Sequence, residues 1–162
     1  MVELILARHA KSDWGDPGIT DHDRPLNPRG LRDAPAMAER LARSGAQVEC
    51  ILSSTALRAG TTAAQFGEAL GIEVEQRGSL YLASDDELFE QAAASGASSV
   101  MIVAHDPGLT ELAFRLSDGG IPHMPTCAVA RFTWDAPLWS DVGDRSPDRW
   151  SFDSPRGGSV NT

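Results

Sequence analysis

The sequence predicts an α/β fold in which a single, mostly parallel sheet lies between two layers of helices. Short apolar runs recur along the 162 residues, each bounded by polar residues, as in strands buried on both faces. Segments with helical spacing alternate with these runs, which is the pattern of a doubly wound sandwich. A chain of this length with 41% hydrophobic residues can bury one core. We therefore expect one domain over residues 1–154 and a flexible tail at 155–162.

The first expected strand is Val2–Ala7, and Arg8 and His9 follow it directly. Ligands bind at the carboxyl ends of strands in open α/β sheets, so this pair is expected at the binding edge. The next segment, Asp13–Leu26, is rich in Gly, Pro and Asp and is expected to be a long loop at the mouth of the sheet. The sequence leaves open whether this loop is a rim or a lid.

The first expected helix begins at Asn27 and Pro28, because Asn caps free amides and Pro suits the first helical position. Its apolar residues recur at helical spacing up to Leu41, and Ser44 with Gly45 ends it. Pro35 lies inside this pattern, so we expect a kink or a displaced helix start.

The rest of the chain repeats the alternation of strands and helices. Ser84 to Glu87 reads as a capping box, with acidic residues favoured by the helix dipole. Residues 135–149 are expected to form a loop because they are rich in Pro, Asp and Gly. The further expected strands are Val48–Leu52, Ile72–Gln76, Ser99–Ala104, Cys127–Trp134 and Trp150–Phe152, and the further helices are Thr55–Leu70, 84–94 and Leu109–Leu116.

Composition excludes several classes of function. The net charge of −9 argues against a general nucleic-acid binder, which needs a basic face. No apolar run approaches the roughly 20 residues that span a bilayer, so no membrane partner is expected. The chain begins without a signal-like segment, and Cys50 and Cys127 are expected to be reduced and buried in a cytoplasmic protein.

Polar side chains that can bind phosphate follow three of the expected strands. Arg8 and His9 follow the first, Ser54 follows the second with Arg58 in the next helix, and His105 follows a third. Because the ends of parallel strands meet at one edge, these residues are expected to converge. Arginines offer planar donors to phosphoryl oxygens, and an imidazole can attack phosphorus.

These motifs, in their order along the chain, resemble those of the histidine phosphatase superfamily, which has a phosphoglycerate mutase-like fold. Further motifs resemble its compact SixA-like phosphohistidine phosphatase branch, and the match runs from about residue 3 to residue 134. The residues that carry the resemblance are Arg8–Ala10, Asp23–Asn27 with Arg29 and Gly30, Ser53–Ala59 with Thr61–Ala63, His105–Leu109 and Met124–Thr126.

The resemblance implies a hydrolase in which His9 attacks phosphorus and forms a covalent phosphohistidine that water then hydrolyses. Arg8, Arg58 and His105 would hold the phosphoryl oxygens, and no metal or other cofactor is implied. Ser12 and Ser54 are candidates for further hydrogen bonds to phosphate, and capping of loop or helix is their alternative role.

The chain departs from the superfamily in one respect. Many members place a glutamate after the strand that follows the second motif, whereas residues 77–83 here contain no acid. An imidazole leaving group, with a pKa near 6.5, needs less protonation than an alkoxide, so the departure favours a phosphohistidine substrate. Asp13 and Asp106 are candidate substitute acids, with loop solvation and helix capping as their alternative roles.

Other phosphatase classes fit the sequence less well. Neither cysteine has the Cys-x5-Arg spacing, and Asp21–Asp23 reads as a solvated loop rather than as a catalytic aspartate pair. His22 and His123 lack metal-ligand spacing and are expected to be exposed. A small-molecule phosphomonoesterase and a noncatalytic phosphate-binding module stay open as alternatives. The partner is accordingly a phosphorylated protein or a small phosphorylated metabolite, and the oligomeric state is open.

Overall fold

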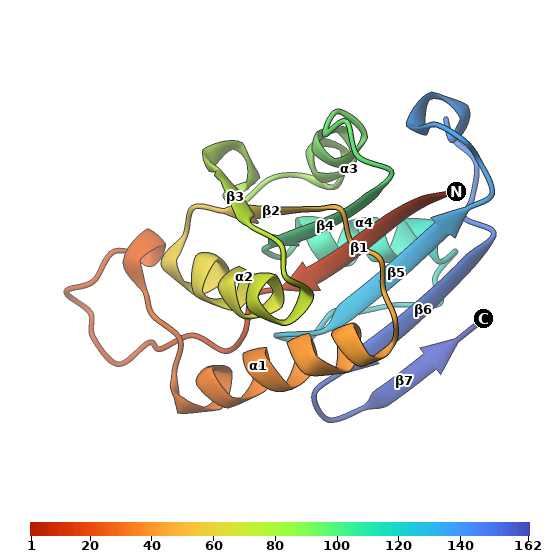
Figure 1. Ribbon diagram of the computed structural model, residues 1–162. Coiled ribbons are helices and arrows are strands. Elements are labelled where there is room, and N and C mark those ends of the chain that lie inside the picture. The colour runs from red at the N-terminus through yellow and green to blue at the C-terminus, as the bar shows by residue number, and fades with distance from the viewer.

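The computed structural model describes all 162 residues, which form one seven-stranded sheet covered by helices on both faces (Figure 1). The strand order is β3-β2-β4-β1-β5-β6-β7. The bounds are β1 Val2–Arg8, β2 Cys50–Ser54, β3 Val74–Arg77, β4 Ser99–Ala104, β5 Val129–Trp134, β6 Arg149–Ser154 and β7 Gly158–Asn161. None of the helices combines the length and the apolarity that crossing a membrane requires.

Four α-helices were expected, and all four are present. They are α1 Pro28–Arg43, α2 Leu57–Leu70, α3 Asp85–Ala93 and α4 Gly108–Leu116. Asn27 caps α1 by accepting from the Gly30 amide, and Ser84 and Glu87 form the expected capping box of α3. The helix α1 starts at Pro28 as predicted and continues through Pro35, so its start is not displaced.

The sheet is mixed rather than mostly parallel, which corrects the sequence prediction. Strands β3, β2, β4 and β1 pair in parallel, whereas β5, β6 and β7 pair antiparallel. A parallel pairing needs a crossover connection, usually a helix, but no α-helix lies between β5 and β6 or between β6 and β7. These connections therefore return the chain antiparallel.

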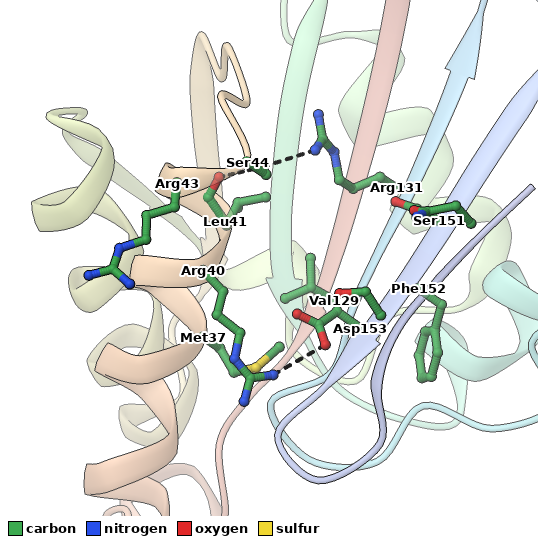
Figure 2. Close-up of a pocket in the computed structure, with 12 residues that line it drawn as sticks. Met37, Arg40, Leu41, Arg43, Ser44, Val129, Arg131, Ser151, Phe152 and Asp153 are labelled. Atoms are coloured by element: carbon green, nitrogen blue, oxygen red, sulfur yellow. Dashed lines mark hydrogen bonds and ion pairs between the residues drawn. The ribbon is translucent and has the colours of Figure 1, made fainter.

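The C-terminal residues also differ from the prediction of a frayed tail. Residues 158–161 form β7, which pairs with β6 from Ser151↔Asn161 to Ser154↔Gly158. Every residue of β7 is exposed, so hydrophobic patterning gave no sign of this edge strand. A cavity of about 430 Å3 lies between α1 and the strands β5–β7 (Figure 2).

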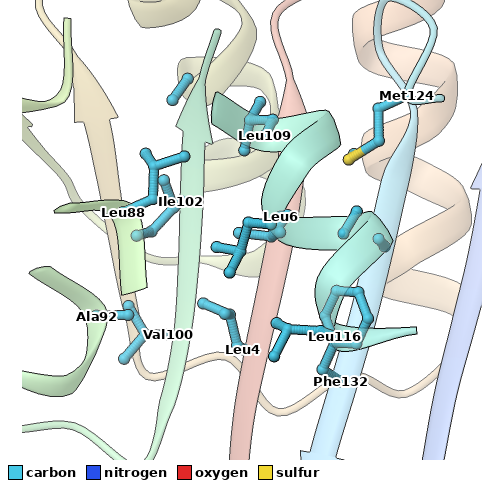
Figure 3. Close-up of a cluster of buried hydrophobic side chains, with 14 of the residues drawn as sticks. Leu4, Leu6, Leu88, Ala92, Val100, Ile102, Leu109, Leu116, Met124 and Phe132 are labelled. Carbon is cyan, nitrogen blue, oxygen red and sulfur yellow. The ribbon is translucent and has the colours of Figure 1, made fainter. Parts of the chain in front are cut away.

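The core consists of two apolar layers, one on each face of the sheet. Leu4 and Leu6 of β1 point into the layer under α3 and α4, which Figure 3 shows with Leu88, Leu109 and Phe132. Ile5 and Ala7 point into the other layer, under α1 and α2. This alternation buries β1 on both faces, as its continuous apolar run predicted. Both cysteines are free thiols; Cys127 is buried as expected, but Cys50 is only partly buried.

Candidate active site

The ends of three parallel strands deliver the predicted polar residues to one edge of the sheet. Arg8 pairs with Ala104, the residue before His105, in the β1–β4 register, and Ser53 of β2 pairs with Val103 of β4. A cavity of about 190 Å3 lies at this edge. Six of the eight residues predicted from the sequence line it: Arg8, His9, Ser12, Arg58, His105 and Asp106.

The backbone around His9 is fixed from two sides. The amide of Ala10 donates to Thr62 Oγ1 at 3.0 Å, which ties the end of β1 to α2. The amide of Cys127 donates to the carbonyls of both Arg8 and His9, at 3.1 and 3.0 Å. A side chain at Gly30 would collide with the backbone carbonyl of Lys11, so glycine lets α1 approach this segment closely. The imidazole of His9 is thus attached to rigid backbone.

His9 presents an unprotonated nitrogen at Nε2. Its Nδ1 lies 2.8 Å from the Ala10 carbonyl, which can only accept, so Nδ1 carries the proton. Nε2 is then unprotonated and receives a long hydrogen bond of 3.4 Å from Arg58 Nε. Burial lowers the pKa of His9 to about 3, and the positive charges around it act in the same direction. The imidazole is therefore neutral at physiological pH and can act as a nucleophile.

His105 presents a donor that has no partner. Its Nε2 lies 2.7 Å from Ser54 Oγ, and that oxygen accepts from the Ala56 amide at 3.2 Å. The Ser54 hydroxyl has no other acceptor within hydrogen-bond distance, so we assign its proton to His105 Nε2 and the imidazole proton to Nδ1. Nδ1 is buried and has no hydrogen-bond partner. Burial, with the charge of Arg58 as the next cause, lowers the pKa of His105 to about 4.

Arg8 offers a second unpaired donor. Its Nη1 donates to the Met124 carbonyl at 3.0 Å and lies 3.4 Å from Asp106 Oδ2, while its Nε is buried without a partner. Buried donors are nearly always satisfied in native proteins, so two orphans in one small cavity indicate a missing acceptor. An anion with several oxygens, such as a phosphoryl group, would accept from both.

The remaining predicted residues have other contacts. Ser12 lines the cavity, but its Oγ accepts from Arg24 Nη1 at 2.6 Å. Ser54 does not line the cavity and lies against His105 instead. Asp13 is exposed outside the cavity, where it accepts from the Gly15 amide. Asp106 Oδ1 accepts from the amide of Thr110, so Asp106 caps the start of α4 while it faces Arg8.

Sequence reasoning missed several residues of the loop 13–26 and its surroundings. Arg24 and the exposed Trp14 line the cavity, and the Arg24 guanidinium lies 3.5 Å from the centre of the Trp14 ring. Asp21 contacts Arg58 rather than solvent alone. His22 is half-buried against Thr55 instead of exposed, whereas His123 is exposed as predicted. The Asp23–Asn27 motif, which includes Arg24, was the one feature of the sequence that could have indicated a role for this loop at the site. No group of three or more His, Cys, Asp or Glu residues is arranged to hold a metal ion.

Comparison with known proteins agrees with this geometry. The model of the histidine phosphatase superfamily (branch 1) matches residues 4–81. An uncharacterized protein of Mycobacterium leprae is 35% identical to this chain, and the alignment covers 92% of this chain and 99% of that protein. A solved structure of a candidate phosphohistidine phosphatase SixA from Agrobacterium tumefaciens is 30% identical, with a TM-score of 0.76 over 85% of this chain and 94% of that one.

A second solved structure, of the protein histidine phosphatase SixA complexed with tungstate, is 27% identical with a TM-score of 0.71, covering 83% of this chain and 89% of that one. The predicted fold class, with its phosphoglycerate mutase-like arrangement, is confirmed apart from the mixed sheet. The chain belongs to the SixA-like branch of the histidine phosphatase superfamily, and it is a phosphatase.

Proposed function

We propose that this phosphatase hydrolyses protein phosphohistidine through a covalent phosphohistidine on His9, without a metal ion. One observation carries the proposal: the unpaired buried donors Arg8 Nε and His105 Nδ1 belong to residues that line the same small cavity as His9, whose Nε2 is unprotonated. This arrangement supports a nucleophile beside donors that can bind phosphoryl oxygens. The SixA proteins to which the chain is similar are named for the same activity.

The reaction takes two steps on His9. Its Nε2 attacks phosphorus as the P–N bond to the substrate imidazole breaks, and that imidazole leaves with a proton taken from solvent. Water then attacks the phosphoryl group, a P–O bond forms, the bond to His9 breaks and the proton lost by the water returns to solvent, which releases inorganic phosphate and regenerates the neutral imidazole. Arg8, Arg58 and His105 donate to the nonbridging oxygens in both steps, so charge stabilisation comes from fixed donors.

The choice of phosphohistidine is supported by the leaving group. Asp106 accepts from Thr110 and faces Arg8, Asp13 is outside the cavity, and the segment that bears a glutamate in many relatives places Leu82 at the cavity. Asp106 is the one acid that lines the cavity, and its two oxygens are engaged by Thr110 and Arg8 rather than aimed at a leaving group. An alkoxide needs a proton donor, whereas imidazole leaves with much less help.

The choice of a protein substrate is supported by the size of the cavity. Its volume of about 190 Å3 is below the range of about 300–1,000 Å3 usual for clefts that enclose small molecules. The phosphoryl group fits inside, while the rest of the substrate stays at the surface. Trp14 and Leu82, 71% and 57% exposed, line the mouth and offer apolar contacts to a protein side chain.

The test is release of phosphate from a phosphohistidine peptide in excess EDTA. We expect turnover by the wild type and a loss of about 10^4-fold or more in the His9→Ala variant, because the nucleophile is gone. The His123→Ala variant, which removes an exposed histidine, is the matched control. Rapid acid-free quenching and mass spectrometry should find the phosphoryl group on His9 during turnover.

Three results would contradict the proposal. Dependence of turnover on added metal would exclude the metal-free mechanism. Hydrolysis of a phosphoserine peptide as fast as the phosphohistidine peptide would show that a proton donor is present and would favour a phosphomonoesterase. Phosphate binding without turnover on either peptide would favour the noncatalytic module.

A further inference from the structure

The loop residue Asp21 holds one end of the Arg58 guanidinium. Its backbone carbonyl accepts from Arg58 Nη1 at 2.7 Å, and its Oδ2 accepts from Nη2 at 3.1 Å. The third nitrogen, Nε, donates toward His9 Nε2 at 3.4 Å. Asp21 thus engages both terminal nitrogens of Arg58 and leaves the Nε side facing the nucleophile.

These two hydrogen bonds to Asp21 determine the direction in which Arg58 Nε can donate a hydrogen bond. The guanidinium is planar and its donors form a rigid fork, so fixing two nitrogens fixes the third. Arg58 itself is 3% exposed and sits in the first turn of α2, but a long side chain has several rotamers that reach the same cavity. The contacts with Asp21 select the one in which Nε lies beside His9.

Asp21 is itself held on its other side. Its Oδ1 accepts from Arg24 Nε at 3.1 Å, and its Oδ2 accepts from the Tyr81 hydroxyl at 2.5 Å. These contacts tie the short 3-10 turn Asp21–Asp23 to the base of its loop and to the segment after β3. The hydrogen bond from Tyr81, with the charge of Arg58, lowers the pKa of Asp21 to about 2, so the carboxylate stays charged at neutral pH.

The neighbouring Asp23 shows what an ordinary solvated acid in this turn looks like. Its side chain is 70% exposed and contacts only Thr20 and His22. Asp21 carries the same charge in the same turn, yet it binds two arginines and a tyrosine from three different segments. The difference between these two acids is the basis of the inference and also supplies its control.

We propose that Asp21 is a positioning residue, which orients Arg58 so that Arg58 Nε meets a phosphoryl oxygen next to His9. The inference rests on the proposed function for the identity of the reaction, but the binding of a phosphate-like anion tests it without turnover. Asp21 touches neither substrate nor the reacting atoms, so its effect must pass through Arg58. Removing Asp21 should therefore matter only while Arg58 is present.

The experiment compares the Asp21→Asn, Asp21→Ala and Asp23→Ala variants in the wild type and in the Arg58→Ala background. Tungstate affinity is measured by calorimetry, hydrolysis of the phosphohistidine peptide gives kcat/KM, and thermal unfolding verifies that each variant folds. Asp21→Asn keeps the size of the side chain and the backbone carbonyl, so it tests the charge even where Asp21→Ala folds poorly.

We expect Asp21→Asn to weaken tungstate binding about tenfold and to lower kcat/KM by up to about 10^2-fold. A misplaced Arg58 Nε would lose its hydrogen bond both to bound tungstate and to the phosphoryl group in the transition state. Asp23→Ala should change both quantities less than about twofold, as a surface substitution does. In the Arg58→Ala background, Asp21→Asn should add less than a further twofold, which a double-mutant cycle reports directly.

Each other outcome decides between the two proposals. If Arg58→Ala weakens tungstate binding but both Asp21 variants bind like the wild type, the positioning role is wrong and the proposed function stands. If the wild type binds tungstate through Arg58 and Asp21 but does not hydrolyse the peptide, the proposed function fails and the positioning role stands. Equal losses with and without Arg58 would mean that Asp21 only supports the loop. A wild type that neither binds tungstate nor hydrolyses the peptide would overturn both, and one that hydrolyses the peptide without binding tungstate would overturn the positioning role alone.

Discussion

The two halves of the sheet carry two arginine-lined cavities that differ in volume and in whether their buried donors are paired. The antiparallel half, with α1, encloses about 430 Å3 lined by Arg40, Arg43 and Arg131 (Figure 2). The parallel half encloses about 190 Å3 lined by Arg8, Arg24 and Arg58. The larger cavity is thus the one without the predicted chemistry.

Pairing distinguishes the two cavities. In the antiparallel half, Arg40 binds Asp153, Arg43 binds Glu39, and Arg131 binds Glu3 with both Nε and Nη2. In the parallel half, Arg8 Nε and His105 Nδ1 are buried without partners. Each arginine of the larger cavity has its own carboxylate. In the smaller cavity Arg24 and Arg58 share Asp21 and Arg8 Nη1 lies near Asp106, yet Arg8 Nε and His105 Nδ1 are left without an acceptor. Arg29 Nε is also buried without a hydrogen-bond partner, but it stands alone outside the cavity, so two such donors on residues of one cavity mark the anion site better than cavity volume does.

The largest effect expected from this comparison, after loss of His9, is at His105. Replacing it by Ala removes the unpaired Nδ1 donor and should lower kcat/KM on the phosphohistidine peptide by about 10^2–10^3-fold, as loss of one oxyanion donor does elsewhere. Ser54→Ala is the matched variant, because it keeps the imidazole and removes the partner that fixes its tautomer, together with the acceptor of the Ala56 amide. We expect a loss of about tenfold there. A His105→Ala variant within threefold of the wild type would show that the orphan donor is not used.

The two halves should also contribute differently to the pH dependence of the stability of the whole chain. Burial lowers the pKa of His9 to about 3 and of His105 to about 4, and no histidine lies in β5–β7. Below the unfolded pKa near 6.5, the unfolded chain binds protons that the folded site does not. Folding stability should therefore fall as pH falls from about 6.5 to about 4.5, by about 1.4 kcal/mol per pH unit for each histidine. Activity should show no loss from protonation of His9 in this range.

Urea unfolding at several pH values measures this dependence. The His105→Gln variant should lose about half of the histidine contribution to the slope, while His123→Gln, at an exposed position, should keep it. A slope that His105→Gln leaves unchanged would mean that His105 is protonated in the folded protein. That result would also remove the reason to place a neutral donor at Nδ1.

The parts of the molecule that sequence predicts are those governed by local patterns. The strand Ser99–Ala104 and the capping box of α3 are confirmed because continuous apolar runs and caps depend on neighbouring residues. Convergence of Arg8, His9, Arg58 and His105 followed from strand ends alone. The mixed sheet and β7 were missed because antiparallel return is set by connections, and β7 is polar and exposed.

Asp21 shows why the loop was beyond prediction. Its partners Arg58 and Tyr81 are 37 and 60 residues away in the chain, and no periodicity connects them. In sequence it is one of several acids among glycines and prolines, which favours the solvated interpretation. The same reasoning was correct for Asp13, which is exposed outside the cavity. Only the folded structure shows that Asp21 binds Arg58 whereas Asp13 is solvated.

The smallest effect on activity is expected in the antiparallel half. Arg131→Ala should leave kcat/KM within about twofold, but it removes the partner of Glu3, whose side chain is 11% exposed, and should cost about 2 kcal/mol of stability. Arg43→Ala breaks an exposed pair with Glu39 and should cost less than about 0.5 kcal/mol. Arg58→Ala should show the reverse pattern, with a large loss of activity. Should Arg131→Ala lower kcat/KM more than tenfold at unchanged Tm, the larger cavity would take part in substrate binding, because a purely structural ion pair acts on stability first.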